Sequence, residues 1–234
     1  MFFDWLMFLF IAPAVLLALV AQGMVSSAYS RMSRVAARMS GYAAARRILD
    51  RAGLQDVPVE VVPGHLSDHY DPTHRVLRLS PEVYEGQSMA AVGIAAHEAG
   101  HALQHAQRYA LMGIRSAAVP MAGLGSGLGA MLASLGVFLT MSAVPAGKLV
   151  LLAGIVLFAG VVVFQLVNLP VEFDASARAK RLLVSEGILR QDEVPYVSQV
   201  LNAAALTYVA ATLQSILQLA YFLFRFMGSQ NRDE

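Results

Sequence analysis

The residues best suited to chemistry in this chain are His97, Glu98 and His101, which form the motif His-Glu-x-x-His. On a helix, residues four apart lie about 40° apart around the axis and about 6 Å apart along it, so both imidazoles can reach one divalent metal ion. Glu98 is rotated by about 100° from His97 and can reach a water molecule on the metal. The spacing therefore predicts a metal centre with Glu98 as its general base.

The composition predicts that this centre belongs to an integral membrane protein. The chain has 234 residues, of which 57% are hydrophobic, and its mean hydropathy is +0.56. The formal net charge is only +1, so nucleic acid is not expected as a partner. Cysteine is absent, which leaves histidine, carboxylate and water as metal ligands.

Long apolar segments divide the chain, because about 20 apolar residues cross the hydrocarbon core of a bilayer. The arginines after the first segment place its end in the cytoplasm by the positive-inside rule, so the active site is expected to face the cytoplasm. The expected parts are a retained transmembrane anchor (1–25), a cytoplasmic unit with the motif helix (26–116), a transmembrane helical hairpin (117–169), a helix beginning at Pro170 (170–195) and a fourth transmembrane or membrane-associated helix (196–227). Residues 228–234 are expected to be disordered.

The cytoplasmic unit is expected to contain a little β-structure before the motif helix. Residues 30–52 read as one basic amphipathic helix, which suits either anionic lipid headgroups or plain hydration. Residues 57–62 and 75–80 alternate like strands, and together they predict a hairpin. The motif helix itself is expected over 87–108.

A zinc ion held by two histidines needs another protein ligand, and the hairpin suggests where to find it. A membrane hairpin that leaves and returns brings its two ends together, so Glu172 can meet His97 and His101. His105, one turn after His101, lies about 12 Å along the helix from His97 and is too far to share the metal. We therefore expect one zinc ion per chain, bound by His97, His101 and Glu172.

This centre predicts metal-assisted hydrolysis of peptide bonds, with protein or peptide substrates. The developing oxyanion also needs a donor, and the sequence leaves several candidates unranked. The 75–80 strand is expected to offer an edge to an extended peptide. The candidates for the oxyanion donor or for support of the zinc ligands are His69, Tyr70, His74, Asp71, Asp174 and Tyr208, although for any single loop residue a plain polar turn is the simpler explanation.

Three stretches, HEAGHALQH, SDHYDP with RVLRLS, and LPVEFDASARA, resemble the YugP-type membrane-bound neutral zinc metallopeptidases of bacteria. More distantly, the chain is similar to the gluzincins of the HtpX and CAAX prenyl protease families. The resemblance implies a mainly α integral membrane protein in the bacterial inner membrane, with a small α+β zincin-like unit at the membrane edge. It also implies zinc and the ligands His97, His101 and Glu172.

The chain departs from those distant relatives next to the third ligand. Their ligand glutamate begins a Glu-x-x-x-Asp pattern, whose aspartate supports a zinc-binding histidine. Here that position is Ser176. The supporting carboxylate is therefore expected from the loop, through Asp68 or Asp71, while Asp174 is expected to stabilise a helix N-terminus.

Other functions fit parts of the pattern. An intramembrane protease of the site-2 type needs its motif inside a spanning helix, and 87–108 is too polar at its end. A catalytically inactive, metal-stabilised scaffold or chaperone-type partner of other membrane proteins would have the same ligands but no use for Glu98. An ion carrier would need ionisable residues in mid-membrane, which the hairpin lacks.

Overall fold

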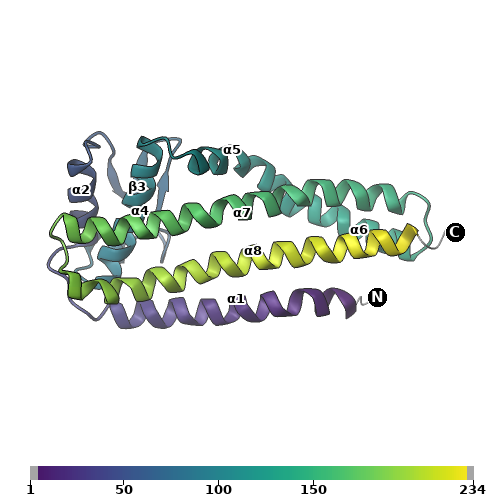
Figure 1. The fold of residues 1–234 in the computed structure, drawn as a ribbon, viewed down its shortest axis with the longest axis horizontal. Helices are drawn as coiled ribbons and strands as arrows, with labels where there is room; N and C mark the ends of the chain where they lie inside the picture. Colours follow the sequence, from purple (N-terminus) through teal and green to yellow (C-terminus); the bar gives the residue numbers. More distant parts are fainter. Residues whose placement is uncertain (1–4, 231–234) are drawn as a thin grey trace. The chain divides into compact units, whose positions relative to one another are not determined.

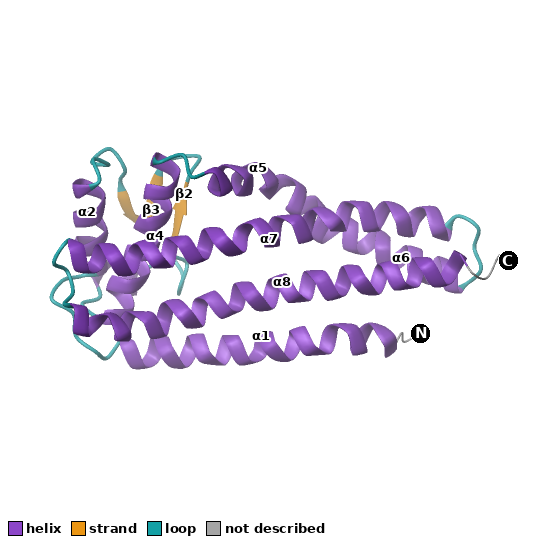
Figure 2. Cartoon of the chain, viewed as in Figure 1, coloured by secondary structure: helices purple, strands orange, loops and turns teal. Residues whose placement is uncertain are grey.

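The computed structural model describes residues 5–230, and the elements of that range are mainly helical (Figures 1 and 2). The helices are α1 (Trp5–Met32), α2 (Gly41–Arg51), α3 (Pro81–Glu85), α4 (Met89–Ala106), α5 (Ala110–Leu124), α6 (Ala130–Met141), α7 (Gly147–Ser185) and α8 (Val194–Gln230). A π-helical turn (Gly125–Gly129) joins α5 to α6, and a short 3₁₀ helix (Gln191–Glu193) precedes α8. The strands are β1 (Val59–Val61), β2 (His69–Asp71) and β3 (Val76–Leu79).

The chain forms two compact units. The first, here called the apolar unit, consists of Met1–Val20, Ile114–Leu169 and Tyr208–Glu234. The second, here called the site unit, consists of Ala21–Gly113 and Pro170–Thr207. In agreement with the sequence analysis, four stretches of the described residues are long and apolar enough to cross a membrane: Trp5–Met32, Ala110–Met141, Gly147–Ser185 and Gln191–Ser229.

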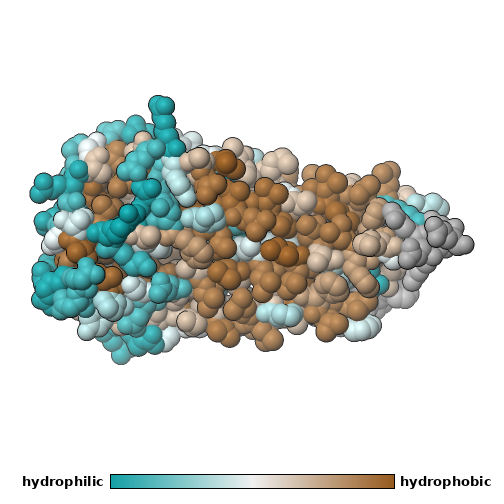
Figure 3. All heavy atoms as spheres, in the orientation of Figure 1, coloured by the Kyte–Doolittle hydropathy of each residue, from teal (hydrophilic) through white to brown (hydrophobic). Residues whose placement is uncertain are grey.

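The surface of the apolar unit suits a lipid environment. Its helices expose large aliphatic and aromatic side chains, such as Leu16, Met131 and Val156, which are 63%, 60% and 65% exposed. In Figure 3 the visible face of these helices is mostly hydrophobic, whereas hydrophilic residues gather on the visible face of the site unit. Apolar side chains exposed over several long helices are stable when lipid rather than water surrounds them.

Glycines allow α6 and α7 to approach closely, as expected for a tight hairpin. A Cβ atom on Gly136 would lie 2.3 Å from the backbone nitrogen of Leu151, and one on Gly154 would lie 2.2 Å from that of Ala133. Gly125 and Gly129 of the π-helical turn meet α7 in the same way. By contrast, a Cβ atom on Gly123 would meet nothing within 4 Å, so not every glycine of this region serves the contact.

The site unit contains a three-stranded sheet, and the expected hairpin is wrong. The strand order is β1-β3-β2, with β1 parallel to β3 and β2 antiparallel to β3. The strand β2 comes from the loop that sequence analysis left without regular structure, and it fills the edge of β3 that was expected to bind a peptide. The strand β3 therefore has no free edge.

The expectation of a single helix over residues 30–52 is also wrong, because turns and an isolated β-bridge at Ala36 separate α1 from α2. Ala37 donates its backbone N–H to Gln87 at 3.0 Å, and Met89 donates to Val35 at 2.9 Å. Ser40 then caps α2 by accepting the N–H of Ala43 at 3.2 Å. These backbone hydrogen bonds hold the segment between α1 and α2 against the start of α4.

The helix α7 continues through Pro170, where a new helix was expected to begin. A proline inside a helix removes one backbone hydrogen bond but does not always end the helix. The fourth expected helix is present as α8, which continues to Gln230. The expectation of disorder therefore fails for Gly228–Gln230, and residues 231–234 lie outside the described part of the chain.

Candidate metal centre

The helix α4 places the motif in the interior of the site unit. Ser88 caps its N-terminus by accepting the N–H of Ala91 at 3.2 Å, and nearly every residue that follows is buried. Small side chains let neighbouring helices lie close: a Cβ atom on Gly100 would lie 2.9 Å from the backbone oxygen of Ala175 on α7. This close approach brings the motif against the part of α7 that carries Glu172.

Three side chains converge where the two helices meet. The Nε2 atoms of His97 and His101 lie 3.2 Å and 3.4 Å from Oε2 of Glu172. Potential ligand atoms of the three residues all lie within 4.8 Å of one another, and Glu172 is only 2% exposed. Glu172 is far from the two histidines in sequence, yet the three residues could together form a zinc site.

The donor set fits zinc in number, type and spacing. Bonds of about 2.0–2.1 Å to a tetrahedral zinc ion place the ligand atoms about 3.3–3.5 Å apart. The distances of 3.2 Å and 3.4 Å between each imidazole nitrogen and the carboxylate oxygen agree with this spacing. Two nitrogens and one carboxylate oxygen leave a fourth position, which is the arrangement of catalytic rather than structural zinc sites.

Glu98 is buried beside these ligands and is held by the sheet. Its Oε2 atom accepts the backbone N–H of Tyr70 on β2 at 2.9 Å. Burial raises the pKa of Glu98 to about 6, although His97 and the N–H of Tyr70 oppose this shift. At neutral pH the side chain is therefore mainly a carboxylate, able to accept a proton.

Each histidine uses its other ring nitrogen for a hydrogen bond within the protein. Nδ1 of His101 lies 2.9 Å from Oε1 of Gln104, and Nδ1 of His97 lies 3.1 Å from Oγ of Ser176. These contacts orient the Nε2 atoms towards Glu172. Gln104 was not singled out by sequence analysis, and its only signal is its position three residues after His101, where a helix places it on the same face.

Asp174 was expected at a helix N-terminus, but it lies inside α7, which runs through this region. Its Oδ2 atom accepts a hydrogen bond from Nε2 of Gln104 at 2.8 Å and one from Nε of Arg178. Asp174 is thus connected to His101 through Gln104. Ser176, at the position where the sequence resemblance to gluzincins would place an aspartate, lies beside His97.

The two loop aspartates expected to support the histidines bind other groups. Asp68 accepts hydrogen bonds from the backbone and the hydroxyl of Ser80 at 2.8 Å and 3.1 Å. Asp71 pairs with Arg78 and His74 at 2.8 Å and 2.6 Å. Both carboxylates therefore stabilise the loop and sheet rather than the imidazoles.

The candidates for the oxyanion donor lie in different surroundings. His69 is exposed on β2, with Nδ1 2.8 Å from the backbone oxygen of Ser67, and His74 is bound to Asp71. The hydroxyl of Tyr70 lies 2.8 Å from Nδ1 of His105, which accounts for that histidine without a metal. Tyr208 belongs to the apolar unit.

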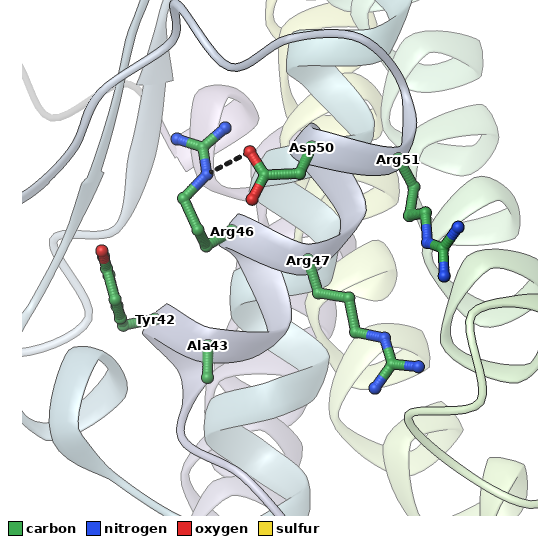
Figure 4. A pocket seen from close by; sticks show the side chains of 6 residues that line it. All are labelled: Tyr42, Ala43, Arg46, Arg47, Asp50 and Arg51. Atoms are coloured by element: carbon green, nitrogen blue, oxygen red, sulfur yellow. Dashed lines mark hydrogen bonds and ion pairs between the residues drawn. The ribbon is translucent and has the colours of Figure 1, made fainter.

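A separate hollow of about 540 Å³ lies over the exposed face of α2. Figure 4 shows the guanidinium group of Arg46 bonded to Asp50, and this arginine also donates to the backbone oxygens of Leu54 and Val57 at 2.8 Å and 2.6 Å. Arg51 pairs with Glu186 at 3.6 Å. Much of the basic face of α2 is therefore used inside the site unit, and the metal-centre residues do not line the hollow.

Comparisons with known proteins agree with this geometry. A family described as "Putative neutral zinc metallopeptidase" matches residues 7–227. The chain belongs to this family. It is also 47% identical over 233 residues to "Putative membrane protease YugP" of Bacillus subtilis (strain 168), with 98% of this chain and 100% of that protein covered. No solved structure matches the chain.

Membership of the family confirms the resemblance found in the sequence, and zinc as the metal that the three side chains could bind. It also agrees with the apolar helices, since the Bacillus protein carries the name of a membrane protease.

Proposed function

We propose that this chain is a membrane-embedded zinc metalloendopeptidase, in which His97, His101 and Glu172 bind the metal and Glu98 is the general base. The observation that carries the proposal is the convergence of two imidazole nitrogens on one carboxylate oxygen, at 3.2 Å and 3.4 Å, beside a buried glutamate. A bound zinc ion lowers the pKa of water and polarises the substrate carbonyl.

The role of Glu98 follows from how its carboxylate is held. Because the N–H of Tyr70 anchors Oε2, the other oxygen is available to the water that attacks the carbonyl carbon. Glu98 takes a proton from this water as the new C–O bond forms. It then gives the proton to the amide nitrogen as the C–N bond breaks, so that this nitrogen leaves as an amine and not as an amide anion.

The family and the long apolar helices also support a location. We place the protein in the bacterial cell (inner) membrane with the site unit in the cytoplasm, because this unit contains most of the basic residues. Substrates are then proteins or peptides that reach the cytoplasmic face of the bilayer.

The test compares the wild type with Glu98→Gln, purified in detergent, for zinc content and for casein cleavage. We expect both proteins to hold about one zinc ion, and the variant to cleave roughly 10²- to 10⁴-fold more slowly because the base is lost. Glu85→Gln, on the exposed α3 of the same unit, is the matched control and should cleave normally. Unimpaired cleavage by Glu98→Gln, or a wild type that neither binds zinc nor cleaves, would refute the proposal.

A further inference from the structure

The side chain of Gln104 is fully buried at the end of α4, with no exposed surface. Its amide group makes three hydrogen bonds, which reach one imidazole and two sites on α7. Nε2 donates to the backbone oxygen of Val171 and to Oδ2 of Asp174, both at 2.8 Å, and Oε1 lies 2.9 Å from Nδ1 of His101. A buried glutamine has no water to replace these partners, so their geometry is restrictive.

The two acceptors on α7 determine which way the amide points. The NH₂ group has two N–H donors, and Val171 and Asp174 use one each. Turning the amide over would place its oxygen against a carbonyl oxygen and a carboxylate, and two buried acceptors would lose their donors. Oε1 must therefore face His101.

The amide orientation in turn determines the tautomer of His101. An amide oxygen can only accept a hydrogen bond, so Nδ1 of His101 must carry the proton. A neutral imidazole protonated at Nδ1 has its lone pair at Nε2, which is the atom 3.4 Å from Oε2 of Glu172. Gln104 thus prepares the nitrogen that faces the metal position.

Ser176 does not impose the same condition on His97. A hydroxyl group can either donate or accept, so the contact of 3.1 Å between Oγ of Ser176 and Nδ1 of His97 is compatible with both tautomers. The two imidazoles are therefore controlled unequally. His101 is the one whose ligand atom is fixed before any metal arrives.

We propose that Gln104 is a positioning residue of the metal centre, which holds His101 in the zinc-binding tautomer and ties it to α7 through Val171 and Asp174. This inference rests on the proposed zinc site. Arg178 also binds Asp174, so it balances the negative charge of that carboxylate. The network therefore supplies orientation rather than extra charge at the imidazole.

The test measures zinc affinity by competition with a chelator, together with the visible spectrum of the cobalt-substituted protein. Gln104→Leu should weaken zinc binding by about 10- to 100-fold and change the cobalt spectrum, because Nδ1 of His101 loses its acceptor. Gln87→Leu is the matched control: this glutamine is exposed just before α4 and is not a partner of Gln104, so affinity and spectrum should stay as in the wild type.

A second measurement keeps the test decisive if Gln104→Leu does not fold. In the zinc-free wild type, nitrogen NMR of the imidazoles should show His101 protonated at Nδ1, because Oε1 of Gln104 can only accept a hydrogen bond. Wild-type zinc affinity in Gln104→Leu, or a zinc-free His101 protonated at Nε2 alone, would overturn the inference. A wild type without zinc would instead refute the proposed function.

Discussion

Ser176 lies next to the candidate metal centre, at the position where the sequence resemblance to gluzincins would place an aspartate. The hydroxyl lies 3.1 Å from Nδ1 of His97 and is 8% exposed as a residue, so it occupies a confined site without a charge. A carboxylate there would accept a stronger hydrogen bond from His97 and make the imidazole a better ligand. The serine therefore leaves His97 a weaker ligand than an aspartate would.

We predict that Ser176→Asp binds zinc up to about 10-fold more tightly, because the new carboxylate fixes the proton on Nδ1 of His97. The metal-free variant should unfold at a lower temperature than the wild type, since a buried carboxylate without a bound cation nearby is costly. Chelator competition and thermal unfolding measure the two effects. Ala177→Asp, on the exposed face of the same helix, should change neither, and weaker zinc binding by Ser176→Asp would contradict the prediction.

Residue spacing predicted much of the metal centre but not its support. The motif on α4 precedes the predicted membrane hairpin and Glu172 follows it. Because a hairpin brings its two ends together and few carboxylates come directly after this one, the sequence was enough to pair His97 and His101 with Glu172. Gln104 was missed because a glutamine carries no charge and has no fixed role in a motif. Its importance comes only from what α7 places opposite it.

At the scale of elements, the packing of α4 against α7 determines whether the ligands can meet. Gly100 lies between the two histidines in the sequence and faces the backbone of Ala175, three residues after Glu172. Any side chain at this position must push the two helices apart. The backbone contact is therefore part of the site, although neither residue has chemistry of its own.

We predict that Gly100→Ala destabilises the protein by about 1–3 kcal/mol, because its Cβ atom would lie 2.9 Å from a backbone oxygen that cannot move aside cheaply. Zinc affinity should fall in parallel as Glu172 moves away from the imidazoles. The control is Gly113→Ala, also in a helix but with nothing within 4 Å of its Cβ atom, which should be neutral or slightly stabilising. Normal zinc affinity in Gly100→Ala would show that the ligands do not depend on this contact.

The order and direction of the strands could not be predicted from their pattern. Alternation of apolar and polar residues identifies a strand but not its partner, and a loop of about a dozen residues allows either direction. Here that loop contributes β2, whose three residues are too few to show a periodic pattern. The break between α1 and α2 could not be predicted for a similar reason. Its hydrogen bonds are made with residues around Ser88, far along the chain.

At the scale of the whole molecule, the distribution of charge leads to a topology that can be tested. Lys148 lies at the start of α7, just after the loop from α6 in the apolar unit, whereas Gly53 follows the end of α2 in the basic site unit. By the positive-inside rule these two turns should lie on opposite sides of the membrane.

We predict that a reporter inserted after Gly53 is active in the cytoplasm, and that one inserted after Lys148 is active only outside it. Two reporter proteins, one active only in the cytoplasm and one active only outside it, measure this orientation directly in cells. A cytoplasmic signal at Lys148 would overturn the proposed orientation, and with it the cytoplasmic origin of the substrates.

The contact between Glu98 and Tyr70 has a consequence for how the protein matures. In the proposed centre the metal ligands come from two helices, whereas the proposed base, Glu98, is held by the backbone of β2. On this proposal, zinc binding and cleavage depend on different contacts. We therefore expect a chain whose β2 has separated from Glu98 to keep its zinc ion but to leave neighbouring proteins uncut until the strand returns.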